Sequence, residues 1–94
     1  MNFSDFVESI KNDAPPNGLS GPLAALWWDL KGDWTTAHGH VDDLSSKDAM
    51  AVHAYLHRKE GSLANADYWY ARAGRECHRS SLEEEWRALV SKLL

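Results

Sequence analysis

Apolar side chains recur at spacings of three and four residues along the chain, from Phe3 to Leu93, and this period constrains the fold more than any other feature. No segment of four to eight residues alternates strictly between apolar and polar side chains, as a half-buried strand would. A chain of 94 residues has room for one hydrophobic core and not for two. We therefore predict a single all-α domain over residues 1–94.

Capping residues and glycines divide the chain into about six helices. The predicted N-caps are Ser4, Asp33, Ser45, Ser62 and Ser81, the last in a capping box with Glu84, and Pro22 is predicted to open the second helix. The predicted stops are Gly32, Gly61 and Gly74, because glycine adopts left-handed geometry easily. The inner stripe of the fifth helix is predicted as Leu63, Ala66, Tyr70 and Ala73. Helices two and three, and helices four and five, are expected to form two hairpins flanked by terminal helices.

The two expected hairpins are similar in sequence. A shift of 29 residues places Gly32 on Gly61 and Ala37 on Ala66. The second unit resembles a tetratricopeptide repeat, in which a glycine forms the turn, alanines allow close helix approach and an aromatic residue fills the gap. The period is shorter than the usual value of about 34 residues. The alternative is that two helical hairpins with glycine turns align this well without being repeats.

Charge and hydropathy exclude several classes of protein. Lys and Arg total 10 against 14 Asp and Glu, a formal charge of −4, which argues against nucleic-acid binding. The longest apolar run, from Leu23 to Trp28, is far shorter than the roughly 20 residues that span a bilayer, so no membrane contact is expected. The first fifteen residues fit no secretory signal, and Cys77 has no internal disulfide partner. We expect a cytoplasmic protein with a free thiol at Cys77.

Three histidines and one glutamate form the first candidate site. His53 and His57 are one helical turn apart, Glu60 follows, and His38 lies on the other hairpin, so His38, His53, His57 and Glu60 could form a divalent metal site or polar cluster. The more usual role of a histidine in an apolar stripe is structural, with His53 donating to a backbone carbonyl or to Glu60 or Asp29. On that interpretation no cofactor is expected.

The outer face of the fifth helix forms the second candidate site. It carries Asn65, Tyr68 and Arg72 with Trp69 at its flank, and Tyr, Trp and Arg are enriched at interface hot spots. With Tyr55 and His57 of the fourth helix, these residues are predicted to line a groove for a protein segment or a second copy of the chain. The alternative is that a terminal helix covers this face.

The motifs from Trp27 to Leu94 resemble a family of small bacterial proteins of uncharacterised function with tetratricopeptide-like hairpins. The resemblance is carried by His53-Ala54-Tyr55-Leu56-His57-Arg58-Lys59-Glu60-Gly61 and by Asn65-Ala66-Asp67-Tyr68-Trp69-Tyr70. It implies the helical fold and no activity. Ser62 stands where the family pattern leads us to expect aspartate, and serine can also cap a helix.

Two functions follow as hypotheses. The first is a helical interaction module that binds a protein partner or itself, as a homodimer. The alternative is a metal-dependent or acid/base enzyme centred on His38, His53, His57 and Glu60.

Overall fold

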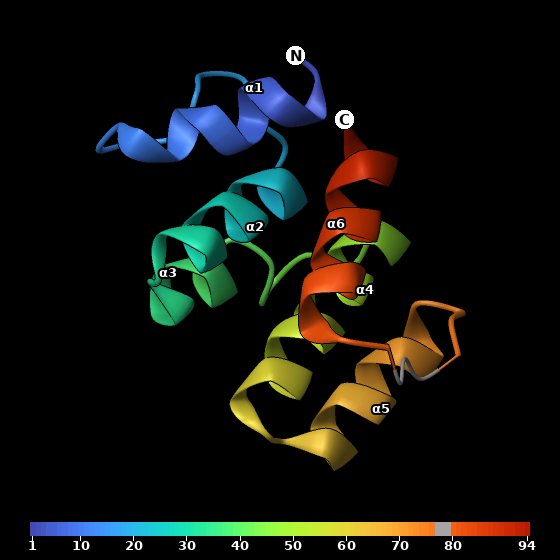
Figure 1. Ribbon diagram of the computed structural model, residues 1–94. Coiled ribbons are helices and arrows are strands. Elements are labelled where there is room, and N and C mark those ends of the chain that lie inside the picture. Colours follow the sequence, from blue (N-terminus) through green and yellow to red (C-terminus); the bar gives the residue numbers. More distant parts are fainter. Residues whose placement is uncertain (77–79) are drawn as a thin grey trace.

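The computed structural model describes residues 1–76 and 80–94 of the chain, so Cys77 lies outside the described residues. Within these ranges the chain forms six α-helices, one 3-10 turn and no strand (Figure 1). The elements are α1 (Phe3–Glu8), η1 (Ser9–Lys11), α2 (Gly21–Lys31), α3 (Trp34–Gly39), α4 (Lys47–Glu60), α5 (Leu63–Arg72) and α6 (Leu82–Leu93). The predicted all-α fold with about six helices is confirmed.

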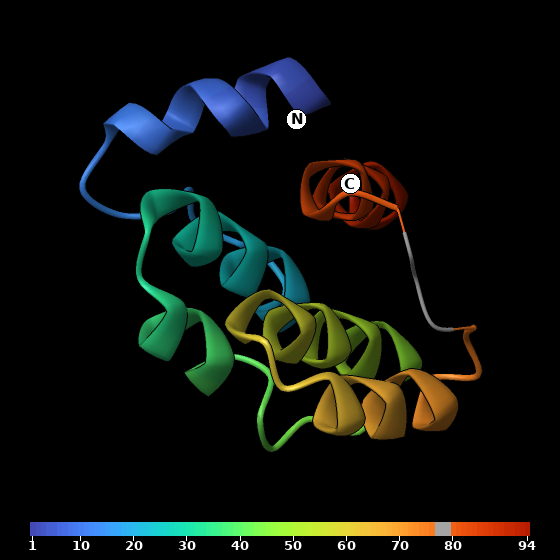
Figure 2. The same cartoon turned by 60° about the horizontal axis from the view of Figure 1, so that its bottom comes forward.

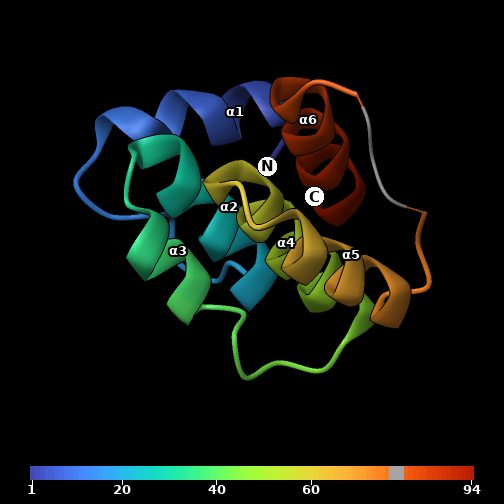
Figure 3. The same ribbon diagram turned by 90° about the horizontal axis from the view of Figure 1, so that it is seen from below.

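Helices α2 and α4 lie at the centre of the fold. Helix α3 packs beside α2 and α5 beside α4, so both predicted helix pairs are neighbours in space. Figures 2 and 3 show α1 and α6 across one side of the row formed by the other four helices. The kinship of the two pairs to tetratricopeptide repeats stays a prediction.

Helix α4 is buried around its whole circumference. Every residue from Ala49 to His57 is buried, although the sequence predicted a single inner stripe. The reason is that α4 packs against α2, α3, α5 and α6, and together these helices cover all of its faces. Polar side chains between Ala49 and His57 therefore face other helices, where each needs a partner.

Indole N–H groups fix three helix contacts. Trp86 donates from α6 to the Leu26 carbonyl oxygen of α2 over 3.0 Å, and Trp34 donates from α3 to the Leu56 carbonyl oxygen of α4 over 2.8 Å. Trp27 donates to the Ser9 hydroxyl of η1 over 3.0 Å. Each indole thus buries apolar area and satisfies its one donor in the same contact.

Two buried carboxylates also connect the helices. Asp29 of α2 accepts hydrogen bonds from Tyr55 and Lys59 of α4, over 2.7 and 2.8 Å. Glu85 of α6 accepts from Arg58 of α4 and Tyr70 of α5, over 2.7 and 2.6 Å. Because every partner lies on another helix, these bonds specify how the helices pack.

Several predicted helix ends are wrong by a residue or two. Asn2, and not Ser4, caps α1, and Ser46, and not Ser45, caps α4, because in each case the hydroxyl or amide oxygen lies in reach of the backbone N–H three residues on. Helix α2 begins at Gly21, one residue before the predicted Pro22, and Ser20 caps it. The caps at Asp33 and at Ser81 with Glu84 are confirmed.

The start of α5 differs from its predicted pattern. Ser62 occupies the N-cap position but its side chain makes no capping hydrogen bond. Leu63, predicted in the inner stripe, is the first residue of α5 and is 56% exposed. Ala66, Tyr70 and Ala73 are buried as predicted.

Among the helices described, none is long and apolar enough to cross a bilayer.

Candidate metal centre

Helices α3 and α4 bring three histidines together. His53 and His57 lie one turn apart on α4 and therefore share a face of that helix. His38 comes from α3, which turns back from α2 through the left-handed Gly32 and is held to α4 by the Trp34 indole. The three rings meet where this face of α4 packs against α3.

The ring nitrogens of the three histidines lie close enough to share one ion. One ring nitrogen each of His38, His53 and His57 lies within 4.8 Å of the others. The Nε2 atoms of His38 and His53 are 3.0 Å apart, a hydrogen bond for which one ring must hold the proton. His53 and His57 are buried, whereas the His38 side chain is 26% exposed, so the cluster meets solvent on the His38 side.

An acidic side chain lies beside the Nδ1 atom of two of the rings. The Nδ1 atom of His57 lies 2.5 Å from a carboxylate oxygen of Glu60. This bond lowers the pKa of Glu60, and it places a proton on Nδ1 of His57. Nδ1 of His38 faces Asp42 at 3.9 Å. The Nε2 atom of His57 is therefore the one with a lone pair available to a ligand.

His53 is the most enclosed ring of the three. It is 4% exposed and stacks on Trp69 of α5 with 4.1 Å between ring centroids. Burial, followed by the neighbouring His57 and His38, lowers the pKa of His53 to about 4, so the ring is neutral near pH 7. Its Nδ1 atom is buried and has no hydrogen-bond partner in the part of the chain that the structure describes.

The structure brings together all four residues of the first candidate site. His53 is buried in the core, as its predicted structural role requires, but the predicted carboxylate partners are wrong: Glu60 bonds His57, and Asp29 bonds Tyr55 and Lys59. The apolar stripe located His53 but could not show that a third histidine would meet it.

Sequence reasoning missed three neighbours of the cluster. Trp34 stacks on His38 with 4.9 Å between centroids, Trp69 covers His53, and Asp42 stands behind His38. Trp34 and Asp42 are each four residues from His38, so this spacing was a usable signal for both, although Asp42 lies beyond the end of α3. Trp69 had no such signal, since it reaches the cluster from a different helix.

The predicted partner-binding residues do not line one groove. Tyr55 is 2% exposed and points to Asp29 of α2, and His57 is buried in the histidine cluster, because α4 has no free face. Asn65, Tyr68 and Arg72 are exposed on α5, and no terminal helix covers them. The Arg72 guanidinium lies over the rings of Tyr68 and Trp69, 5.7 and 5.4 Å from their centroids.

Comparisons of the chain with known protein families, with curated proteins and with solved structures find no match. The resemblance to small bacterial proteins thus depends on the sequence motifs alone.

Proposed function

We propose that this protein binds one divalent transition-metal ion of the zinc class through the imidazoles of His38, His53 and His57. The observation that carries the proposal is the convergence of three ring nitrogens within 4.8 Å at a helix interface. Imidazole nitrogen is a preferred ligand of zinc, copper, iron and nickel, whereas magnesium and calcium take oxygen ligands.

The spacing of the nitrogens supports this class of ion. Zinc–nitrogen bonds of about 2.0–2.1 Å at tetrahedral angles place two ligand nitrogens about 3.3 Å apart. The Nε2 atoms of His38 and His53 are already 3.0 Å apart. The His57 nitrogen lies within 4.8 Å of the other two, so it closes the triangle after a shift of at most about 1.5 Å.

The surroundings of the rings also favour a metal. Histidine ligands in metal sites commonly donate their other N–H to a carboxylate, and Glu60 accepts from Nδ1 of His57 in this way. With three protein ligands and solvent access beside His38, a fourth position is open to water. An ion bound there would supply Lewis-acid chemistry, as in catalytic zinc centres with three protein ligands.

A zinc titration of the untagged, chelator-treated chain tests the proposal. Isothermal titration calorimetry should give one zinc per chain. His38→Gln removes one ligand from a position that is 26% exposed and should weaken binding by about 100-fold or more, since loss of a supporting carboxylate alone costs about 10- to 100-fold. Glu60→Gln should fall within that smaller range.

His40→Gln is the matched control. His40 is an exposed histidine two residues from His38 and outside the cluster, so this variant should bind zinc like the wild type. Circular dichroism of each variant reports the fold. Zinc binding that is absent from the folded wild type, or that falls equally in His38→Gln and His40→Gln, would refute the proposal.

Self-association is a second candidate function, favoured by the uncovered face of α5. Tyr68 is 53% exposed on it, and Asn65 and Arg72 are exposed beside it. We propose that two copies of the chain pair through this face. Light scattering should give twice the chain mass, and Tyr68→Lys should give a monomer without loss of helix; a monomeric wild type would exclude this function.

A further inference from the structure

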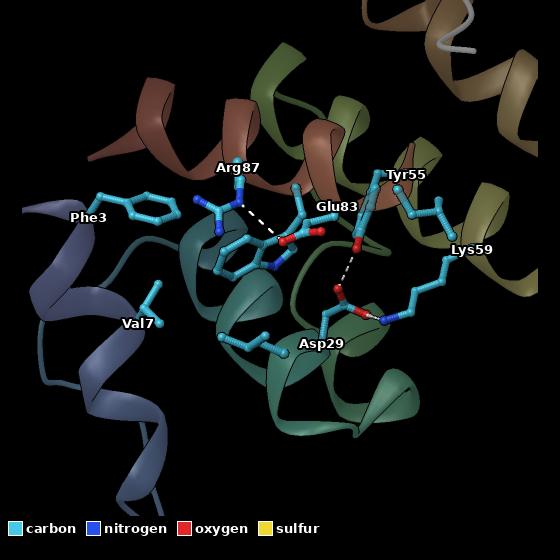
Figure 4. Close-up of a pocket in the computed structure, with 10 residues that line it drawn as sticks. Phe3, Val7, Asp29, Tyr55, Lys59, Glu83 and Arg87 are labelled. Atoms are coloured by element: carbon cyan, nitrogen blue, oxygen red, sulfur yellow. Dashed lines mark hydrogen bonds and ion pairs between the residues drawn. The ribbon is translucent and has the colours of Figure 1, made fainter. Parts of the chain in front are cut away.

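A cavity of about 380 Å³ lies between α1, α2, α4 and α6, on residues that take no part in the histidine cluster (Figure 4). Its volume falls in the range of about 300–1,000 Å³ that is usual for small-molecule sites. Most of its wall is apolar, formed by Phe3, Val7, Leu30, Leu82 and Trp86. The wall therefore suits the apolar body of a small ligand.

One end of the cavity holds an ion pair with a spare donor. Figure 4 shows Asp29 pointing to both Tyr55 and Lys59, and each of its oxygens accepts one bond, from Tyr55 at 2.7 Å and from Lys59 at 2.8 Å. The carboxylate is 3% exposed and its charge is balanced by Lys59. The Lys59 ammonium has three N–H groups, is 40% exposed, and uses one of them on Asp29.

A second cation lies on the opposite wall. The Arg87 guanidinium lies over the ring of Phe3, 5.4 Å from its centroid. Its Nε atom is 3.4 Å from Glu83, in a pair whose side chains are 59% and 76% exposed, and such a pair holds its partners weakly. The remaining guanidinium N–H groups form a planar fork that matches a carboxylate.

We propose that this cavity binds a small apolar monocarboxylate, with its body against Phe3 and Trp86 and its carboxylate between Lys59 and Arg87. The charged groups that line the cavity indicate a negatively charged ligand. Asp29 is neutralised by Lys59, and Glu83, which also lines the cavity, is 76% exposed and paired with Arg87, whereas both cations keep donors that can face the cavity. An ammonium ligand would meet Lys59 and Arg87 as like charges.

Three probes of one shape test the charge preference. Phenylacetate, phenylacetamide and phenethylamine share an aromatic body and differ in the charge of the polar group. Titrations of the full chain, followed by amide chemical shifts, should show phenylacetate binding most tightly, with shifts confined to α1, α2, α4 and α6. The proposal is overturned when the amide or the amine binds as tightly as the carboxylate, or when none of the three shifts these residues.

Two charge-neutralising variants on α6 distinguish binding in the cavity from a general effect of surface charge. Arg87→Gln should weaken phenylacetate binding about tenfold, the factor of a hydrogen bond between charged groups. Lys92→Gln removes the same charge from an exposed position outside the cavity and should leave the affinity unchanged. Both positions are exposed, so both variants keep the fold, and equal affinities in the two would overturn the proposal.

Discussion

Replacement of Glu85 by glutamine should be among the most destabilising changes that preserve the shape of a side chain. Glu85 is 1% exposed and its carboxylate accepts from both Arg58 and Tyr70. The amide can still bond one partner, but Arg58, whose side chain is 14% exposed, loses its counter-charge. Breaking a buried pair costs about 3–5 kcal/mol, and the bond that Arg58 keeps with the Ser80 carbonyl places this change near 3 kcal/mol.

Urea unfolding followed by tryptophan fluorescence measures this loss. A chain of this length has a total free energy of unfolding of about 5–14 kcal/mol, so a loss of about 3 kcal/mol is a large part of it. In thermal unfolding the same loss lowers Tm by about 12–24 °C. Glu83→Gln is the control: it removes the same charge two residues away, from a side chain that is 76% exposed, and should cost under about 1 kcal/mol. Equal losses in the two variants would refute the assignment of Glu85 as the carboxylate that joins α6 to α4 and α5.

Three further predictions concern acid, packing and an indole bond. In the chelator-treated protein the unfolded chain takes up the His53 proton below about pH 6.5, whereas the folded chain does so only near its lowered pKa of about 4. The contribution of His53 to the free energy of unfolding is therefore complete above about pH 6.5, and it should fall by about 1 kcal/mol by about pH 5, after allowance for screening by polar neighbours. A urea midpoint that does not change between these pH values would contradict a buried neutral His53. Gly21→Ala would place a Cβ 2.8 Å from Leu44 Cδ1 and 3.0 Å from the His40 carbonyl oxygen, so it should destabilise the protein by about 1 kcal/mol despite the better helix propensity of alanine, and a gain in Tm would be inconsistent with that contact. Trp34→Phe removes the donor to the Leu56 carbonyl and should cost about 1 kcal/mol, whereas a neutral result would mean that the indole bond does not hold α3 to α4.

The helices could be predicted because their signals are local. The caps at Asp33 and Ser81 and the left-handed Gly32 and Gly61 act within one turn of their helix ends, so the residues alone define them. Where two adjacent residues can both cap, as at Ser45 and Ser46, the loop that enters the helix decides, and that loop depends on tertiary packing.

The packing could be predicted only in part. A helix surrounded by four others, as α4 is, has no polar face to mark its orientation, so the sequence could not show that Tyr55 would turn to α2 and His57 to α3. Glu85 is 1% exposed, whereas Glu83 in the same glutamate run is 76% exposed, and nothing in the sequence of the run distinguishes the two.

All of the candidate site except the contact with His38 could be predicted from the sequence. Spacing on α4 placed His53 and His57 on one face, and spacing after them placed Glu60 within reach of His57. The meeting with His38 depends on how α3 packs against α4, a contact of high sequence separation that no local pattern encodes. The stacking of Trp69 on His53 is also a contact between distant residues that no local pattern encodes.

X-ray absorption at the zinc edge, on untagged protein loaded with one zinc per chain, tests the central claim most directly. The proposal that His38, His53 and His57 hold one ion predicts three imidazole nitrogens at about 2.0–2.1 Å and one oxygen ligand from water, with the number of imidazoles reduced to two in His38→Gln. A zinc shell with at most one imidazole, or an unchanged shell in His38→Gln, would contradict it.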